Sequence, residues 1–284
     1  MEPRVHDLYP ANIAALDRSE LEIAVQKRAQ TVYLGGGVVL ARVLTRYKML
    51  LHTADRGFAC HVMMDGFWES WLTQFFARTL KPGMHAFDIG ANYGYYSLLF
   101  ADMVSAAGCV AAVEPNPAAA ALLRESVLLN GFSGHTVVIE AALGAAPEGT
   151  ARLFVPRGEP KNAFISVGEE HFDGVVHSVA LTSVDALVGR LGLADLIKID
   201  AEGAEVDIVA GMGGLLRTAP PALVLEFNAA RCADPAALLR SLLNVYGTVA
   251  YVDFQGTAKS VLPETVLTTK VGEDWLLYFA APGA

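Results

Sequence analysis

The chain has 284 residues, a net charge of −9 at neutral pH, 53% hydrophobic residues and only 18% charged residues. This composition is typical of a globular protein with a large buried core, and its acidic balance disfavours nucleic acid as a partner. The three cysteines lie far apart in the sequence, and no uninterrupted apolar stretch is long enough to span a membrane. We therefore expect a cytoplasmic protein without a membrane span.

Residues 1–80 are predicted to form an accessory segment of helices and short strands. Ser19 and Glu22 fit the capping-box pattern of a helix that runs to about Gln30. The three glycines at 35–37 interrupt this helix.

The second half of this segment is predicted to contain strands and one long helix. Val38–His52 is expected to form one or two strands, and Phe58–Met63 another. Aromatic and leucine residues then recur at three- and four-residue spacing between Phe67 and Leu80, which predicts an amphipathic helix whose apolar face packs in the core. We expect the whole segment to serve as a lid or as the contact in a homo-oligomer.

From residue 84 onward, predicted strands and helices alternate. The predicted strands are 84–88, 109–113, 136–140, 151–155, 178–181, 196–199, 222–227, 248–254 and 275–280. The predicted helices are 95–104, 117–130, 182–190, 205–212 and 234–246. This alternation predicts a mainly parallel sheet with helices on both faces. No helix is evident between the last two strands, which indicates an antiparallel final pair.

The junction between the first of these strands and its helix is predicted to bind a cofactor. The strand ends in Asp88, and a loop with glycines at Gly90 and Gly94 leads into the helix. Such a junction presents bare backbone and a helix N-terminus to a ligand. The next strand ends in Glu114, an acidic residue placed to accept hydrogen bonds from a ribose. Together these features indicate an adenosine-type cofactor.

The loop departs from a dinucleotide-binding fingerprint. Asn92 stands where the second glycine of Gly-x-Gly-x-x-Gly would let a pyrophosphate approach, and the carboxylate of Asp88 would repel a diphosphate. S-adenosylmethionine carries an ammonium and a sulfonium and has no phosphate, so it suits the loop better than NAD. An NAD(P)-dependent oxidoreductase and a non-catalytic cofactor-binding partner subunit stay open as alternatives.

Several motifs occur in a fixed order: FDIGANYGYYS, VEPNP, EAALG, LTSVDAL, IKIDAEGAE and LVLEFN. With these motifs, residues 64–230 resemble the FkbM family of S-adenosylmethionine-dependent methyltransferases. The resemblance implies an α/β, Rossmann-like class I methyltransferase domain over residues 81–284. Such a domain has a seven-stranded, mainly parallel sheet with an antiparallel last strand, here preceded by the α+β accessory segment. It also implies O-methylation of a hydroxyl on a small molecule, sugar or natural product.

We expect each part of the cofactor to meet a different segment. The loop would hold the methionine half, with loop and helix amides facing its carboxylate, Glu114 would bind the ribose hydroxyls, and the end of the third strand would lie near the adenine. The expected cofactor-binding residues are Asp88, Gly90, Asn92, Tyr93, Gly94, Glu114, Pro115, Glu140 and Ala141.

Asp200 and Glu202 are the expected catalytic residues. Asp200 follows a buried strand at the edge where open α/β sheets bind ligands, and a carboxylate there can orient an acceptor or take its proton. Lys198, inside that strand, needs an acidic partner, and Glu205 is expected to cap the following helix or to form a structural pair. Together with Glu226, Asp200 and Glu202 offer oxygen ligands for a divalent metal. We do not favour a metal, because no histidine metal-binding motif accompanies these residues.

The acceptor is expected to meet Glu226 and a polar loop before the LTSVDAL motif. By the resemblance, Asn162 and Ser166 in this loop lie beside the cofactor and acceptor. His171 and His177 are close enough in sequence to reach an acceptor, although a lone loop histidine is more often solvated.

Overall fold

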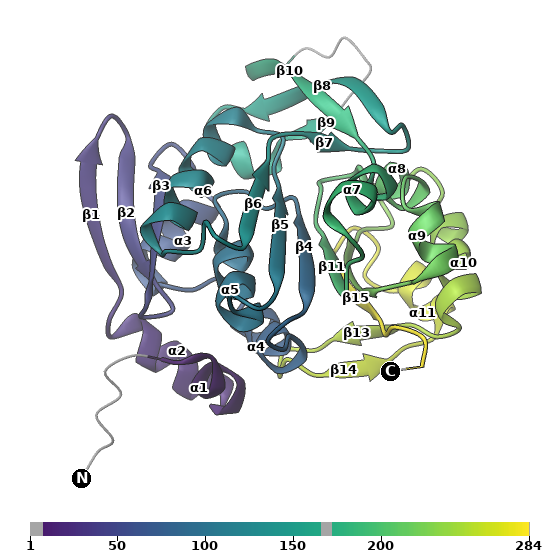
Figure 1. Cartoon of the computed structure of the whole chain (residues 1–284), viewed down its shortest axis with the longest axis horizontal. Helices are drawn as coiled ribbons and strands as arrows, with labels where there is room; N and C mark the ends of the chain where they lie inside the picture. Colours follow the sequence, from purple (N-terminus) through teal and green to yellow (C-terminus); the bar gives the residue numbers. More distant parts are fainter. Residues whose placement is uncertain (1–7, 166–171, 284) are drawn as a thin grey trace.

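An eight-stranded sheet forms the centre of the computed structural model, which describes residues 8–165 and 172–283 (Figure 1). Its strands are β4 (His85–Ile89), β5 (Cys109–Val113), β6 (Thr136–Ile139), β11 (Leu196–Ile199), β12 (Ala222–Phe227), β13 (Ala250–Val252), β14 (Ala258–Ser260) and β15 (Trp275–Phe279). They lie in the order β14-β13-β15-β12-β11-β4-β5-β6, parallel from β12 to β6, with β15 antiparallel to β12 and to β13. The predicted α/β sheet is confirmed, and β14 adds an eighth strand at its edge.

Helices cover both faces of this sheet, as predicted. The helices on one face are α4 (Ser70–Thr79), α5 (Tyr95–Val104) and α6 (Pro117–Leu129), and those on the other are α7 (Val184–Leu191), α8 (Glu205–Ala210), α9 (Gly213–Thr218) and α10 (Pro235–Tyr246). Successive strand residues point to opposite faces, so Val110 and Ala112 join the first core while Ala111 and Val113 join the second. Burial on both faces explains why these strands are continuous apolar runs.

Charged residues interrupt one of these apolar faces near the carboxyl edge. The parallel register places Lys198 of β11 beside Asp88 of β4 and beside Val224 of β12. Because side chains alternate, Asp88, Lys198 and Glu226 share the face that α4 and α5 cover. The Lys198 ammonium lies 3.3 Å from a carboxylate oxygen of Asp88, which confirms the acidic partner predicted for this buried lysine.

The N-terminal segment packs onto the same core as α5 and α6. It contains α1 (Pro10–Ala15), α2 (Arg18–Gln26), a three-stranded antiparallel sheet of β1 (Gln30–Gly35), β2 (Val38–Val43) and β3 (Tyr47–His52), and α3 (Phe58–Asp65). Backbone N–H groups of β3 donate to α6: Leu50 to the Ser126 hydroxyl and Lys48 to the Asn130 amide oxygen, both at 2.9 Å. The division between an accessory segment and a domain at residue 80 stays a prediction.

Three details of this segment differ from the sequence-based expectation. Asp17, rather than Ser19, caps α2, because its carboxylate accepts the Ser19 N–H and Glu20 completes the capping box. The predicted helix ends at Gln26, and 30–35 forms strand β1 instead. The strand predicted at 58–63 is wrong: Asp55 accepts the N–H groups of Gly57 and Phe58, which starts helix α3.

The aromatic helix predicted between residues 67 and 80 is confirmed as α4. Leu72, Phe75 and Phe76 are buried in the core, as its three- and four-residue spacing predicted. The helix begins only at Ser70, so Phe67 and Trp68 lie in the preceding turn.

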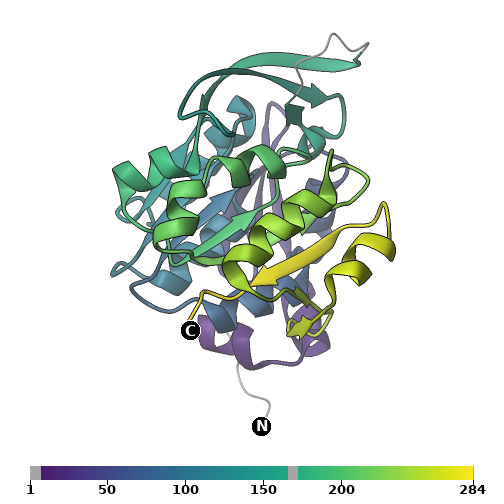
Figure 2. The ribbon, with the colours of Figure 1, turned by 90° about the vertical axis from the view of Figure 1, so that its right-hand side faces the viewer.

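A second, four-stranded sheet covers the carboxyl edge of the large sheet, at the top of both views (Figure 1, Figure 2). It consists of β7 (Ala142–Leu143), β10 (Gly174–Thr182), β8 (Glu148–Pro156) and β9 (Phe164–Ile165), in that order, with the 3₁₀ turn η1 (Pro160–Asn162) between β8 and β9. The strands predicted at 151–155 and 178–181 fall inside β8 and β10, which pair antiparallel over nine residues. Ser166 and His171 lie outside the described residues.

The antiparallel final pair of strands is confirmed by β13 and β15. The prediction that no helix connects these two strands is wrong. Their connection contains β14 and the short helix α11 (Pro263–Thr268). Pro263 occupies the first helical position, where a missing N–H costs nothing, and Val266 of this helix is buried. Within the described part of the chain, none of the helices has both the length and the apolar character needed to cross a membrane.

Candidate active site

A cavity of about 140 Å³ lies at the carboxyl edge of the large sheet, bounded on one side by the four-stranded sheet. The ends of β4, β5, β6, β11 and β12 meet here, where open α/β sheets bind their ligands. Eight residues predicted from the sequence line this cavity: Gly90, Asn92, Glu114, Pro115, Ala141, Asp200, Glu202 and Glu226. The structure therefore brings the predicted cofactor and catalytic residues together.

Glu114 is a buried carboxylate at the end of β5, only 6% exposed. Its two oxygens accept the backbone N–H groups of Asn92 and Asn116, each at 2.7 Å, which fixes the carboxylate beside the loop. Burial raises the pKa of Glu114 to about 7, although these two hydrogen bonds lower it. An anchored carboxylate at this edge can accept hydrogen bonds from a diol.

The loop after β4 uses most of its own amides. Gly90 and Ala91 donate to the carbonyl of Val113, Asn92 donates to Glu114, and Gly94 donates to the carbonyl of Ala91. These four loop amides are therefore not available for the predicted contact with a cofactor carboxylate. The amides in the first turn of α5 remain available for it.

Gly90 is required by close packing against the end of β11. Its φ is +75°, and a Cβ atom there would lie 1.6 Å from the backbone oxygen of Asp200. The Asp200 N–H also donates to the carbonyl of Ile89 at 3.1 Å. The loop after β4 and the backbone of Asp200 therefore pack directly against each other.

Asp88 lies beneath the loop rather than in the cavity lining. It is completely buried, accepts a 2.6 Å hydrogen bond from the Ser97 hydroxyl, and pairs with Lys198. Its position differs from the predicted direct contact with the cofactor. The contribution of Asp88 is to hold Lys198 and the start of α5 in place.

Asp200 faces the cavity and contacts Lys198 at 3.3 Å. Burial would raise the pKa of Asp200, but the Lys198 ammonium and a hydrogen bond with Glu226 lower it below its ordinary value. Burial alone would lower the pKa of Lys198, yet Asp200 and Asp88 raise it above its ordinary value. Lys198 and Asp200 therefore remain an ion pair at neutral pH.

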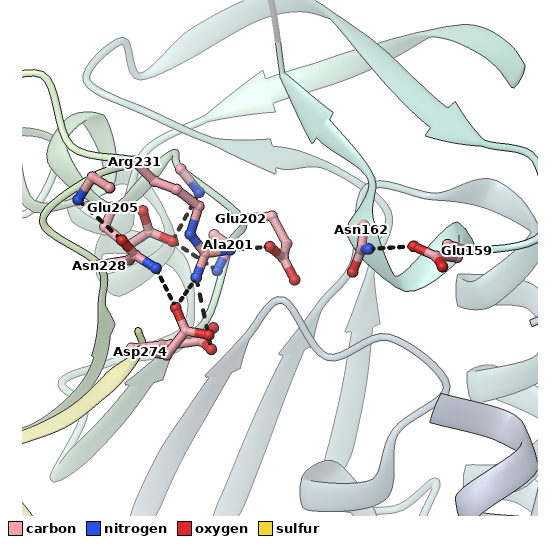
Figure 3. Close-up of polar contacts among 11 residues, drawn as sticks. Glu159, Asn162, Ala201, Glu202, Glu205, Asn228, Arg231 and Asp274 are labelled. Atoms are coloured by element: carbon pink, nitrogen blue, oxygen red, sulfur yellow. Dashed lines mark hydrogen bonds and ion pairs between the residues drawn. The ribbon is translucent and has the colours of Figure 1, made fainter. Parts of the chain in front are cut away.

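The other acidic side chains are held by Arg231 (Figure 3). This guanidinium contacts Glu202 and Asp274 and lies 3.9 Å from Glu226. The carboxyl oxygens of Asp200, Glu202 and Glu226 lie within 4.8 Å of one another, as a metal site would require. Because Arg231 and Lys198 already supply positive charge to this cluster, the residues present fit a metal poorly. Glu205 instead accepts the N–H groups of Ala201 and Gly203 in the turn before α8, so its contacts are structural, and they do not cap the helix itself.

Three residues around the cavity have left-handed backbone conformations without being glycine. They are Glu69, Asn92 and Glu202, with φ values of 38°, 50° and 49°. Such conformations cost free energy and persist where the surrounding structure fixes them, which often happens at functional sites. These residues belong to three separate segments of the chain, and their strained backbone conformations all lie around the cavity.

Glu140 does not line the cavity. Its carboxylate pairs with Arg124 at 2.9 Å, and both side chains are about 40% exposed. We expect Glu140→Gln to leave the affinity for S-adenosylmethionine within about twofold and to lower stability by less than about 1 kcal/mol, because exposed ion pairs contribute little. Calorimetric titration and urea unfolding measure both quantities. A tenfold loss of affinity would return Glu140 to the binding site.

Other predicted residues also lie away from the cavity lining. Tyr93 is buried against Phe58, and Gly94 caps α5 where a Cβ would meet Leu123. Asn162 donates to Glu159 (Figure 3), and His177 lies within β10. None of these four residues lines the cavity.

The N-terminal segment and η1 supply lining residues that the sequence reasoning missed. Phe58, Trp68 and Glu69 form one wall, and the Lys161 ammonium lies 5.8 Å from the Trp68 ring. The Tyr96 hydroxyl donates to Glu69 at 2.7 Å, and burial raises the pKa of Glu69 to about 7. Trp68 and Glu69 belong to the sequence DGFWES at residues 65–70.

This strand order, with a carboxylate-lined cavity at the carboxyl edge, is that of the Rossmann-like class I methyltransferase fold. The family model described as the Methyltransferase FkbM domain matches residues 88–247, more than half of the chain. The protein therefore belongs to the FkbM methyltransferase family.

Individual relatives are more distant. Over 69 residues the chain is 38% identical to a protein-L-isoaspartate O-methyltransferase of Aeropyrum pernix, a match that spans 24% of this chain and 25% of that protein. The solved methyltransferase FkbM from Methylobacillus flagellatus KT is 14% identical with a TM-score of 0.44, over 74% of this chain and 53% of that one. A putative transferase from Pyrococcus horikoshii is 12% identical with a TM-score of 0.45, over 87% and 72%. The chain thus matches about a quarter of the curated relative and about half of the solved FkbM protein.

Proposed function

We propose that this protein is an S-adenosylmethionine-dependent methyltransferase that O-methylates a hydroxyl of a small molecule or sugar in the cytoplasm. The observation that carries the proposal is the division of the cavity between an anchored Glu114 and an acidic wall. The anchored carboxylate of Glu114 supports a role in binding ribose hydroxyls, while Glu69, Asp200 and Glu202 suit a ligand with positive charge. The lining cations among the described residues are Lys161 and Lys198, and Lys198 is already paired.

The residues present fit this cofactor better than a dinucleotide. A pyrophosphate would meet loop amides that are already engaged in hydrogen bonds. Apolar walls from Pro115, Ala141 and Leu143 support an adenine position beside Glu114. Phe58, Trp68 and Glu69 support a lid role for the N-terminal segment. We also propose that this segment forms the contact in a homo-oligomer.

The chemistry divides between cofactor and protein. S-adenosylmethionine supplies an electrophilic methyl group, and its transfer to a hydroxyl oxygen releases the proton of that hydroxyl. Asp200 would take this proton, because Lys198 keeps its carboxylate ionised at the cavity wall. The cavity would contribute mainly by aligning the acceptor, an effect that can reach about 7–11 kcal/mol in favourable systems. Arg231 supports a mechanism without a metal.

Binding of the two candidate cofactors gives the first test. We expect calorimetric titration to show S-adenosylmethionine binding with a Kd at least about tenfold lower than that of NAD, because the cavity favours a cation over a diphosphate. Tight binding of NAD alone would overturn the proposal in favour of an oxidoreductase.

The acceptor follows from a second measurement on the same protein. Incubation with S-adenosylmethionine and a library of sugars and hydroxylated natural products, read by mass gain, identifies the methylated compound. Turnover should persist with a chelator present. Cofactor binding without any methylated product would favour a non-catalytic partner subunit.

A further inference from the structure

Asp200 and Glu226 are direct neighbours at the ends of two parallel strands. The register pairs Ile199 of β11 with Leu225 of β12, so the next residues along each strand stand side by side. Both line the cavity, and one carboxyl oxygen of each lies within 4.8 Å of the other. Two carboxyl groups this close in a largely buried site cannot both ionise without a large electrostatic cost.

The cations around the pair are distributed unevenly. Lys198 contacts Asp200 and Asp88, each at 3.3 Å, and its charge acts less strongly on Glu226 than on these two. Arg231 contacts Glu202 and Asp274 and reaches Glu226 only at 3.9 Å.

Glu226 therefore faces mostly acidic groups. They come from every element packed around it: Asp200 and Glu202 after β11, Asp274 before β15, and Glu69 at the start of α4. The side chain of Glu226 is only 18% exposed, so water screens this repulsion poorly.

We infer that Glu226 is a protonated carboxylic acid that donates a hydrogen bond to the ionised Asp200 and so acts as a positioning residue. Burial, the charge of Asp200 and this hydrogen bond raise the pKa of Glu226 to about 12, in agreement with the geometry. The two carboxyl groups share one negative charge and one proton, and Lys198 fixes the charge on Asp200.

This arrangement gives the two acids different tasks, a consequence that rests on the proposed function. Lys198 and Glu226 hold the Asp200 carboxylate from the side of the sheet, and this carboxylate, which lines the cavity, accepts the proton of the acceptor hydroxyl. That proton passes to Asp200 and then to water, while Glu226 keeps its own proton throughout. Glu226 thus orients the base without exchanging a proton with the acceptor.

The pH dependence of stability tests the protonation state without any ligand. A glutamate whose pKa rises on folding stabilises the protein fully below its unfolded value, near 4.5, and that contribution is lost as the pH rises toward the folded value. Glutamine cannot ionise, so Glu226→Gln should melt at a higher temperature than the natural protein at pH 8. The difference should close near pH 4.5. The exposed Glu125→Gln, on α6, serves as the matched control and should show no such trend.

Infrared spectroscopy of the unchanged protein gives an independent readout. At pH 9, Glu69 and Glu114, with pKa values of about 7, are ionised, so a protonated-carboxyl band should come from Glu226. The band should disappear in Glu226→Gln. A missing band in the unchanged protein, or a Glu226→Gln variant that melts lower at pH 8, would show an ionised Glu226 paired with Arg231 and overturn the inference.

Turnover separates this inference from the proposed function. Glu226→Gln retains a hydrogen-bond donor to Asp200 and should turn over at least about tenfold faster than Glu226→Leu. Equal losses in the two variants would contradict the positioning role. If S-adenosylmethionine fails to bind, the proposed function fails, while the melting and infrared results still decide the protonation of Glu226.

Discussion

Asp200→Asn is expected to lower kcat by about 10²–10⁴-fold while the Kd for S-adenosylmethionine changes by less than about threefold. Asparagine keeps the shape of the side chain and its contact with the cavity but cannot take a proton. The hydrogen bond from the Asn92 N–H to Glu114 does not involve Asp200, and the packing of Gly90 involves only the backbone of Asp200, so both stay unchanged. Single-turnover rates with the identified acceptor measure the first quantity, and calorimetry measures the second.

The control for this variant is Asp185→Asn, in the first turn of α7. Asp185 accepts the N–H groups of Gly214 and Leu215 at the start of α9 and does not line the cavity. This variant changes a structural carboxylate, so it should alter stability without the selective loss of kcat. If Asp200→Asn kept its turnover, Asp200 would be neither the base nor an essential orienting group.

Gly90→Ala is expected to destabilise the protein by about 3–5 kcal/mol and to weaken cofactor binding at least about tenfold. The new Cβ would meet the backbone oxygen of Asp200 at 1.6 Å, and a backbone atom cannot rotate away as a side chain can. The loop or the end of β11 must shift, and either movement displaces the carboxylates that line the cavity. Urea unfolding and calorimetric titration measure the two effects.

Gly83→Ala provides the matched control for this variant. Gly83 has a similar left-handed conformation, with a φ of 89°, but a Cβ there meets no atom within 4 Å. Its cost should be that of the backbone conformation alone, about 1 kcal/mol. Equal destabilisation of the two variants would show that the contact between Gly90 and Asp200 has no energetic role.

The parallel part of the fold was predictable because its signals are local. Strands β11 and β12 match their predicted bounds, since strands buried on both faces are short continuous apolar runs. Helices α6 and α10 begin with Asn116-Pro117 and Asp234-Pro235, in which a capping side chain precedes a proline.

The errors occur where tertiary contacts decide the structure. Residues 58–63 alternate too weakly to distinguish a strand from a helix, and the cap from Asp55 selects the helix. The four-stranded sheet depends on pairing between β8 and β10, whose partners are more than 20 residues apart at the sheet centre. Propensity and periodicity carry no information about such pairing.

The site was predictable for residues at strand ends and unpredictable elsewhere. Glu114 and Asp200 follow apolar strands, and Glu226 is the next-to-last residue of another strand at the same edge, so their convergence follows from the parallel sheet. Glu140 also ends a strand, yet it turns outward because Arg124 on α6 offers a partner. Trp68 and Glu69 reach the cavity from a segment whose placement depends on packing against the core, which the sequence does not reveal.

The cover of the cavity is a separate structural layer from its floor. Leu153, Lys161 and Ile165 line it from the chain between β6 and α7, while Glu114, Asp200 and Glu226 belong to the parallel sheet. The shape of the cover can therefore vary independently of the floor. If the proposed function holds, we expect that exchanging the segment from β8 to β10 between relatives would change the acceptor while the residues of the floor stay in place.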